Sequence, residues 1–238
     1  KNGSIPLQDA CVVLQKDSEM YLVGYTNASG QVQFDLEFPS LGTINITVSK
    51  HDYIPYLGNI SVYNDMSLSE GWNFISFPFN QTIDKQNISI RYNQSSYDWQ
   101  DAVNSDIISN YVFGWNRSLQ SYTFSDTIIP GEGFWVYSYE NANIWAHSNK
   151  PFEEYITTLN VDWNTVSIPY YQNQSKDILT VQNNTDTYSW DEAVDVDIIN
   201  DYIFGWNGSS QSYSFSDTFI PGQAYWLYAY QSCILKRE

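Results

Sequence analysis

The sequence predicts an all-β fold made of more than one module. Aromatic residues form 17% of the 238 residues, with 20 Tyr, 12 Phe and 9 Trp, which is typical of pleated, half-buried sheet surfaces rather than of helices. In residues 1–64 the expected strands recur at intervals of roughly ten residues, as in small β-sandwiches. At roughly 100 residues per domain, a chain of this length holds two or three domains.

Residues 1–64 are expected to form an immunoglobulin-like β-sandwich. The tetrapeptide Asn27-Ala28-Ser29-Gly30 indicates a tight hairpin with Gly where a positive φ is needed, and Ser40-Leu41-Gly42 indicates a second turn. Strands are expected at 11–14, 20–26, 32–38, 43–49 and 59–63.

A family resemblance supports this reading of the first module. The order DACVVLQK…MYLVGYTNASGQVQFDLEFPSLGTINITVSKHDYIPYLGNISV covers about a quarter of the chain. With its 26–30 hairpin, 47–49 strand and Tyr53-Ile54-Pro55-Tyr56 corner, it resembles the immunoglobulin-like module that follows the catalytic domain of gingipain-type cysteine peptidases. The resemblance implies a non-catalytic module of a secreted protein, because the peptidase domain and its Cys–His pair have no counterpart in this sequence.

The rest of the chain is a duplication. Residues 71–147 align with 162–238 without a gap, at a constant offset of 162 − 71 = 91 residues. Trp72-Asn73 recurs as Trp163-Asn164, and Phe113-Gly114-Trp115-Asn116 recurs as Phe204-Gly205-Trp206-Asn207. The duplication predicts one fold for both copies. The two β-rich domains are expected at 65–152 and 153–238, with linkers at 65–70 and 149–154.

Each copy is expected to combine strands with one short helix. The alternation Trp72, Phe74, Ser76 opens a strand, and residues 97–103 are typical of a capped short helix. Three more strands are expected at 111–115, 122–124 and 134–139, and Pro130-Gly131 turns the chain into the last one. The repeat resembles the GWN-x-I-S-x-P … GWN … PG-x-G-x-W units found in tandem in archaeal cell-surface proteins. This resemblance covers about two thirds of the chain and implies no enzyme activity.

The charge of the chain excludes several classes of partner. A net charge of −17 repels the phosphates of nucleic acids and anionic lipids. The sequence has no apolar run near 18 residues and does not begin with a signal-peptide pattern, so we expect a mature or trimmed segment without direct membrane insertion.

Eleven Asn-x-Ser/Thr triplets point to the cell exterior, whereas residue frequencies alone would produce about four. They predict a glycosylated extracellular or cell-surface protein, with an Asn- and Ser-rich surface composition as the alternative. The acceptors are Asn2, Asn27, Asn45, Asn59, Asn80, Asn87, Asn93, Asn116, Asn173, Asn183 and Asn207.

No catalytic constellation is recognisable. The sequence holds no phosphate-binding loop, nucleophile elbow or zinc pattern, and neither His51 nor His147 has a ligand at metal-binding spacing, so we expect no enzyme activity. Carboxylates around the expected helices would either bind calcium or cap the helices, and the second interpretation is favoured, with no cofactor expected. These carboxylates are Asp98, Asp101, Asp106, Asp191, Glu192, Asp195 and Asp197.

Aromatic residues on the last strand of each copy are the main candidate for a binding surface. Trp135, Tyr137 and Tyr139 alternate on one strand face, and Trp226, Tyr228 and Tyr230 repeat the pattern. They are expected to form a core and an interface with another module or subunit, or else a platform that stacks on sugar rings.

The two cysteines are candidates for a disulfide. If Ala10, Val12 and Leu14 face the core, Cys11 points outward. Cys11 and Cys233 are expected either to bridge, within one chain or between neighbours, or to remain inert free thiols.

Together these features predict a non-catalytic extracellular structural or adhesive module, with copies of itself or other surface proteins as partners. The second copy stops at Glu238, where the first copy continues through 149–155. Its end is therefore expected to be an open strand edge through which chains assemble end to end into a filament. The alternative is a carbohydrate-binding accessory region of a secreted gingipain-like peptidase.

Overall fold

The computed structural model describes residues 6–18, 20–36, 42–62, 65–79, 81–146 and 155–237. The chain divides into two compact units, Lys1–Tyr63 and Asn64–Glu238. Both units are built from antiparallel β-sheets, and the described helices are short segments of the second unit. The predicted all-β class is confirmed.

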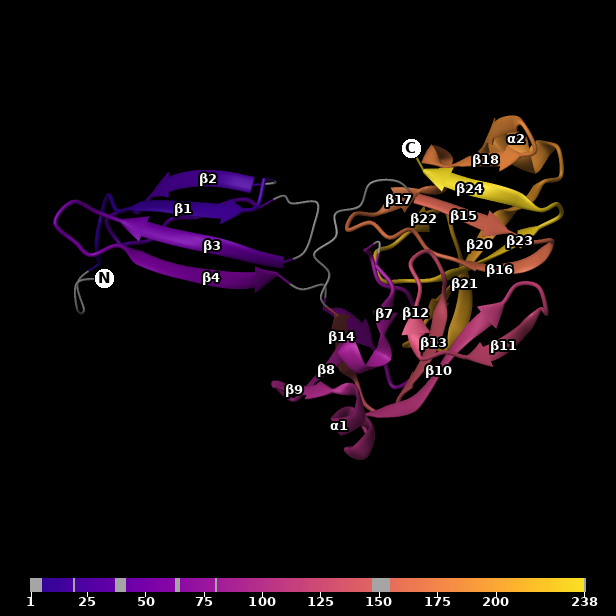
Figure 1. Cartoon of the computed structure of the whole chain (residues 1–238), viewed down its shortest axis with the longest axis horizontal. Helices are drawn as coiled ribbons and strands as arrows, with labels where there is room; N and C mark the ends of the chain where they lie inside the picture. Colours follow the sequence, from indigo (N-terminus) through magenta and orange to yellow (C-terminus); the bar gives the residue numbers. More distant parts are fainter. Residues whose placement is uncertain are drawn as a thin grey trace. The chain divides into compact units, whose positions relative to one another are not determined.

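In the first unit the described strands form one four-stranded sheet in the order β2-β1-β3-β4 (Figure 1). Val12, Leu14 and Ile44 are buried on its inner face, where Val32 and Phe34 pack against them. The strands are β1 (Cys11–Lys16), β2 (Met20–Tyr25), β3 (Gly42–Ser49) and β4 (Tyr56–Val62).

The strand predicted at 32–38 is absent from its described part, residues 32–36. A Cβ atom on Gly24 of β2 would lie 2.7 Å from Val32 Cγ2 and 2.9 Å from Phe34 Cζ. The missing side chain of Gly24 therefore leaves the space that these two side chains fill. The segment covers the face of the sheet instead of adding a strand to its edge.

The second unit contains both repeats, and each repeat has the same arrangement of sheets. In copy 1 the sheets have the orders β11-β10-β13-β6, β5-β14-β8-β9 and β12-β7. Their strands are β5 (Met66–Leu68), β6 (Gly71–Ile75), β7 (Ile83–Asp84), β8 (Ile88–Tyr92), β9 (Ser95–Asp98), β10 (Ile108–Asn116), β11 (Ser121–Phe124), β12 (Thr127–Ile128), β13 (Phe134–Ser138) and β14 (Ala142–Ala146).

Copy 2 repeats these sheets as β21-β20-β23-β16, β15-β24-β18-β19 and β17-β22. The strand orders match one to one, so the prediction of one shared fold is confirmed. Its strands are β15 (Tyr155–Leu159), β16 (Asp162–Val166), β17 (Gln174–Ser175), β18 (Thr180–Asn183), β19 (Asp186–Ser189), β20 (Ile199–Asn207), β21 (Ser212–Ser216), β22 (Thr218–Phe219), β23 (Tyr225–Ala229) and β24 (Cys233–Arg237).

Two expectations about segment ends are wrong. Residues 65–70 are not a linker, because β5 pairs with β14 and buries Met66 and Leu68. The end of copy 2 is not an open edge, because β24 pairs with β15 on one side and with β18 on the other. In both copies the strand that precedes the aligned repeat completes this sheet, so the last strand lies inside it. The linker expected at 149–154 lies outside the described residues.

The expected short helices are present as α1 (Trp99–Asn104) and α2 (Trp190–Asp195). The carboxylate of Asp98 accepts a hydrogen bond from the amide of Asp101 at 2.7 Å. Ser189 and Glu192 form a capping box at the start of α2. Each helix places one Trp and one Ala in the core of its copy.

The two copies pack against each other with reciprocal contacts. The hydroxyl of Ser167 donates to that of Ser76 at 2.6 Å, and these residues are equivalent in the alignment. The amide of Ser76 donates to the carbonyl of Gly222, and the amide of Ser167 donates to the carbonyl of Gly131, both at 3.1 Å. Such reciprocity is the mark of an isologous, two-fold interface. The duplication has therefore placed an interface of the dimer type inside one chain.

Candidate functional site

Tryptophan and glutamine side chains form hydrogen bonds between the two copies, across the two-fold interface. The indole N–H of Trp115 donates to the carbonyl of Trp163 at 2.9 Å, and that of Trp206 donates to the carbonyl of Trp72 at 2.7 Å.

The glutamines repeat the same reciprocity at the same two tryptophans. Gln120 accepts from the amide of Trp163 and donates to its carbonyl, each at 3.0 Å. Gln211 makes the same pair of bonds with Trp72, at 2.8 and 3.0 Å. Each copy therefore fixes the first strand of the repeat in its neighbour.

Aromatic rings fill the space between the copies. Trp135 and Trp226 are each only 7% exposed. Trp135 meets Trp206 edge to face at 5.1 Å, and Trp226 meets Trp115 in the same way at 4.9 Å. Phe74 stacks on Trp135 at 4.5 Å and on Trp226 at 5.6 Å. Edge-to-face and stacked pairs of this kind are favourable beyond the area that they bury.

Two open pockets flank this aromatic core. Their volumes, about 400 and 380 Å³, lie within the range of ordinary ligand sites, roughly 300–1,000 Å³. Tyr122 and Tyr213 line both pockets. The other residues that line the first pocket are Trp72, Phe113, Trp135 and Trp206, and those that line the second are Trp163, Phe204, Trp226 and Trp115. The offset of 91 residues exchanges the two sets, so the internal axis relates the pockets.

The walls of each pocket are aromatic and uncharged. In the first pocket Trp72 is at 66° to Phe113 and at 86° to Trp135. In the second, Trp163 is at 72° to Phe204 and at 86° to Trp226. The rings therefore form steep sides rather than a flat platform.

The shared tyrosines supply hydroxyl groups to both pockets. Burial raises the pKa of Tyr122, and the neighbouring Tyr213 raises it further, while the indole N–H of Trp135 opposes the shift. Burial likewise raises the pKa of Tyr213, against the opposing effect of Trp226. Both phenols are therefore neutral at physiological pH and able to donate a hydrogen bond.

Exposed rings extend each pocket over the protein surface. Phe113 and Tyr111 of β10 contact Phe124 at 5.0 and 5.3 Å, while Tyr137 of β13 contacts both Trp72 and Tyr139 at 5.2 Å. Copy 2 repeats this row with Tyr202, Phe204, Phe215, Trp163, Tyr228 and Tyr230. Several of these rings are half or more exposed.

The aromatic residues singled out from the sequence divide between two environments. Trp135 and Trp226 lie in the interface between the copies, whereas Tyr139 and Tyr230 are 49% and 45% exposed. Tyr137 and Tyr228 are partly buried against Trp72 and Trp163. The sequence reasoning missed the tyrosines shared between the pockets and the tryptophans of β6 and β10. Their recurrence at the constant offset was the available signal.

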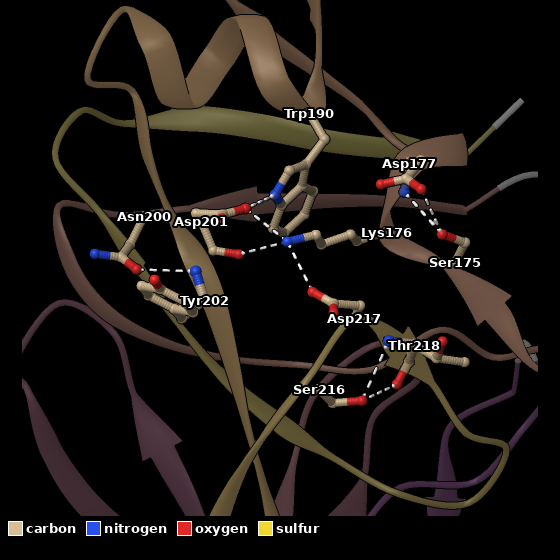
Figure 2. A network of polar contacts seen from close by, with 10 residues as sticks. All are labelled: Ser175, Lys176, Asp177, Trp190, Asn200, Asp201, Tyr202, Ser216, Asp217 and Thr218. Atoms are coloured by element: carbon tan, nitrogen blue, oxygen red, sulfur yellow. Dashed lines mark hydrogen bonds and ion pairs between the residues drawn. The ribbon is translucent and has the colours of Figure 1, made fainter.

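A polar network in copy 2 joins three elements (Figure 2). The ammonium of Lys176, in the 3-10 helix η2 (Lys176–Ile178), lies 2.6 Å from the carboxylate of Asp201 and 3.0 Å from that of Asp217. The indole N–H of Trp190 donates to the same Asp201 oxygen at 3.3 Å. Burial opposes the charge of Lys176, but the two carboxylates outweigh it and raise its pKa. The bond from Lys176 lowers the pKa of Asp201.

Copy 1 contains a reduced version of this network. Its 3-10 helix η1 (Lys85–Asn87) holds Lys85 2.7 Å from Asp126, but Asn110 stands in place of Asp201 and accepts from Lys85 only through its backbone carbonyl, at 3.4 Å. Both lysines form ion pairs with aspartate side chains. They therefore link segments of their own copy and are not free nucleophiles.

The cysteines are free thiols. Cys11 is half-buried on the outer side of β1, as its alternation with Val12 and Leu14 predicts. Cys233 is 4% exposed in the core of copy 2, and burial raises its pKa to about 12. This environment favours the alternative of an inert thiol for Cys233.

The glycosylation acceptors differ in accessibility. Asn116 and Asn207 occupy the same turn in both copies, where each side-chain oxygen accepts two backbone amides. Asn183 is 9% exposed and donates to Gln231. Asn2 and Asn80 lie outside the described residues. The remaining acceptors, Asn27, Asn45, Asn59, Asn87, Asn93 and Asn173, are exposed.

Across the described ranges, no group of three or more His, Cys, Asp or Glu side chains is placed to hold a metal ion. Asp98 and Glu192 cap helices, and His51 is an exposed partner of Asp52. His147 lies outside the described residues. No helix in the part of the chain that the structure describes is long and apolar enough to cross a membrane.

Comparison with known proteins identifies no relative of this chain. No protein-family model, curated protein or solved structure matches the chain significantly. The two resemblances noted in the sequence therefore remain expectations.

Proposed function

We propose that this chain is a non-catalytic adhesive module of the cell exterior, in which the repeat pair binds carbohydrate through its two aromatic pockets. The observation that carries the proposal is the pair of symmetry-related pockets with their rows of exposed rings. Large exposed apolar patches mark interaction sites, because leaving them in water is unfavourable. The same rings are exposed in both copies, so the surface is a feature of the repeat.

The chemistry of the pockets suits a neutral sugar. The C–H face of a pyranose ring stacks on an aromatic ring, while the hydroxyls of Tyr122 and Tyr213 can donate to sugar oxygens. Because the pockets are open, sugar hydroxyls that meet no protein group stay hydrated. The net charge of −17 repels anionic polymers, and among the described residues no carboxylate lines the pockets to pair with a cation.

The accessible glycosylation acceptors support placement outside the cell. Asn27, Asn45 and Asn59 in the first unit are exposed, as are Asn173 and Asn207 in the second. A glycan is bulky and requires such exposure. None of the acceptors that the structure describes lines either pocket, so glycans on them would leave the pockets' own residues unmodified.

Affinity electrophoresis tests the proposal. The intact chain is run through gels that contain hydroxyethyl cellulose, galactomannan, arabinoxylan or dextran. We expect at least one gel to retard it and the double variant Tyr122→Ser/Tyr213→Ser to lose the retardation. Tyr25→Ala is the matched control, because it removes an exposed aromatic ring, 65% accessible, from the first unit. Normal migration through all four gels would refute carbohydrate binding.

Assembly with neighbouring copies is a separate proposal. Paired strands on both sides of β24 remove the edge on which the sequence argument depended. The edge strand β4 still exposes Tyr56 and Leu57 at 62% and 74%, which offers a different surface for contact. Analytical ultracentrifugation of native material tests it: sedimentation as a monomer at all concentrations would refute assembly.

A further inference from the structure

We infer that the two pockets are equivalent subsites of one bivalent site for an unbranched, neutral, β-linked glucan chain, which binds in either direction. This inference rests on the proposed carbohydrate-binding function and specifies the ligand and the stoichiometry. It starts from the internal two-fold axis, because equivalent residues line both pockets and make equivalent contacts.

Equivalence is visible in the contacts that shape each pocket. Trp72 lies 5.7 Å from Phe113 and 6.3 Å from Trp135. Trp163 lies at the same two distances from Phe204 and Trp226. The contacts across the axis also repeat, since Trp135–Tyr213 and Trp226–Tyr122 are both 6.3 Å apart. A sugar unit therefore meets the same walls in either pocket, and short oligosaccharides should occupy both with similar affinity.

The shared tyrosines make the pockets continuous. Tyr122 and Tyr213 line both pockets, and each tyrosine ring lies 6.3 Å from a tryptophan of the other copy, Trp226 or Trp135. A chain leaving one pocket therefore enters the other across the tyrosine pair. A sugar chain has a direction, but a two-fold site offers identical surroundings to a chain and to its reverse. The site should therefore accept both orientations.

The steep aromatic walls favour sugars with C–H bonds on both ring faces. In β-linked glucose the hydroxyls are equatorial, so each face presents axial C–H bonds to an aromatic ring. Two walls nearly perpendicular to each other, such as Trp72 and Trp135 at 86°, then contact a face and an edge of one sugar unit. Axial hydroxyls would place polar groups against uncharged rings and leave them without partners.

Isothermal titration calorimetry of the intact chain with cellobiose and cellohexaose tests the inference. We expect two cellobiose molecules per chain and one cellohexaose. Engaging both subsites with one molecule should raise the affinity by about 10²–10⁴-fold. Trp72→Ala removes a wall of the first pocket only, and Trp163→Ala a wall of the second only. Each should lower the cellobiose stoichiometry from two to one and abolish most of the gain for cellohexaose, with Tyr25→Ala as the unaffected control.

Direction is read by NMR, with a spin label at the reducing end of cellohexaose. Equal broadening of the indole N–H signals of Trp135 and Trp226 is expected, and clearly unequal broadening of the two signals would overturn binding in both directions. One cellobiose per chain, or unequal effects of the two tryptophan variants, would overturn the equivalence of the subsites.

The chemical class of the ligand is tested by comparing different ligands in the same measurements. Binding of tetramethylammonium without binding of cellohexaose would show that the pockets are cation cages. Retardation by galactomannan or dextran without binding of cellohexaose would overturn this inference while the proposed function stood. Failure in every gel and in calorimetry would remove both.

Discussion

Replacing Gly133 by alanine should weaken the packing between the two copies. A Cβ atom at this position would lie 2.6 Å from Cε2 of Phe74 and 2.7 Å from Cβ of Ala224. Neither neighbour can move freely, because Phe74 is stacked between Trp135 and Trp226, and the Cβ of Ala224 is attached directly to the backbone. The positions of copy 2 that are equivalent to Phe74 and Gly133 hold Thr165 and Ala224. Copy 2 therefore combines the methyl group of an alanine with a threonine, which is smaller than phenylalanine.

The size of the effect follows from two opposing terms. Overpacking a close-packed core costs about 1–3 kcal/mol. Replacing glycine by alanine also lowers the conformational entropy of the unfolded chain, which stabilises the fold by about 0.4–1 kcal/mol. The free energy of unfolding of the repeat pair should therefore fall by about 0.5–2 kcal/mol. For a unit of 238 − 64 + 1 = 175 residues, this corresponds to a decrease in Tm of about 1–8 °C.

Urea unfolding followed by tryptophan fluorescence measures this change selectively. The first tryptophan in the sequence is Trp72, so the first unit does not contribute to the signal. The double variant Phe74→Thr/Gly133→Ala reproduces the pair found in copy 2. Its destabilisation should be smaller than the sum of the two single changes by about 0.5–2 kcal/mol. A Gly133→Ala variant as stable as the wild type, or strict additivity in the double variant, would refute the reasoning.

Three further predictions concern polar and reactive groups of copy 2. Asp201→Asn should destabilise the chain at pH 7 by at most about 1 kcal/mol, since the carboxylate is partly exposed. Because Lys176 lowers the pKa of Asp201, its contribution is present above the ordinary value of 3.8 and lost as the pH falls through the lower folded value. Urea titrations from pH 7 downward should show the difference in full at pH 7 and a smaller difference as the pH falls below this ordinary value. Cys233 should resist iodoacetamide at pH 8 while Cys11 reacts, and mass spectrometry should find both labelled only in urea; equal labelling in the native chain would contradict the burial. In a glycosylating host, peptide mapping should find Asn183 unmodified, because it is buried, and a glycan there would contradict the described fold of β18.

Local features were largely predictable from the sequence. The alternation of Val12 and Leu14 with Cys11 correctly placed one set of side chains inside β1 and the cysteine outside. Residues 97–103 predicted a capped short helix, and Asp98 caps the helix that begins at Trp99. These features depend on neighbouring residues, and a period of two or of 3.6 residues expresses them directly. The constant offset of 91 residues likewise established that both copies share a fold.

The pockets depend on the tertiary structure. Alternation shows that Trp135 lies on an apolar face of its strand, but it does not show that Trp206 of the other copy covers that face. The predicted linker and the predicted open edge were wrong for the same reason, because β5 and β24 gain their partners from segments distant in sequence. What covers an apolar face depends on shape complementarity between surfaces far apart in the chain. Here the duplicated surface is complementary to itself, and the site exists only where the two copies meet.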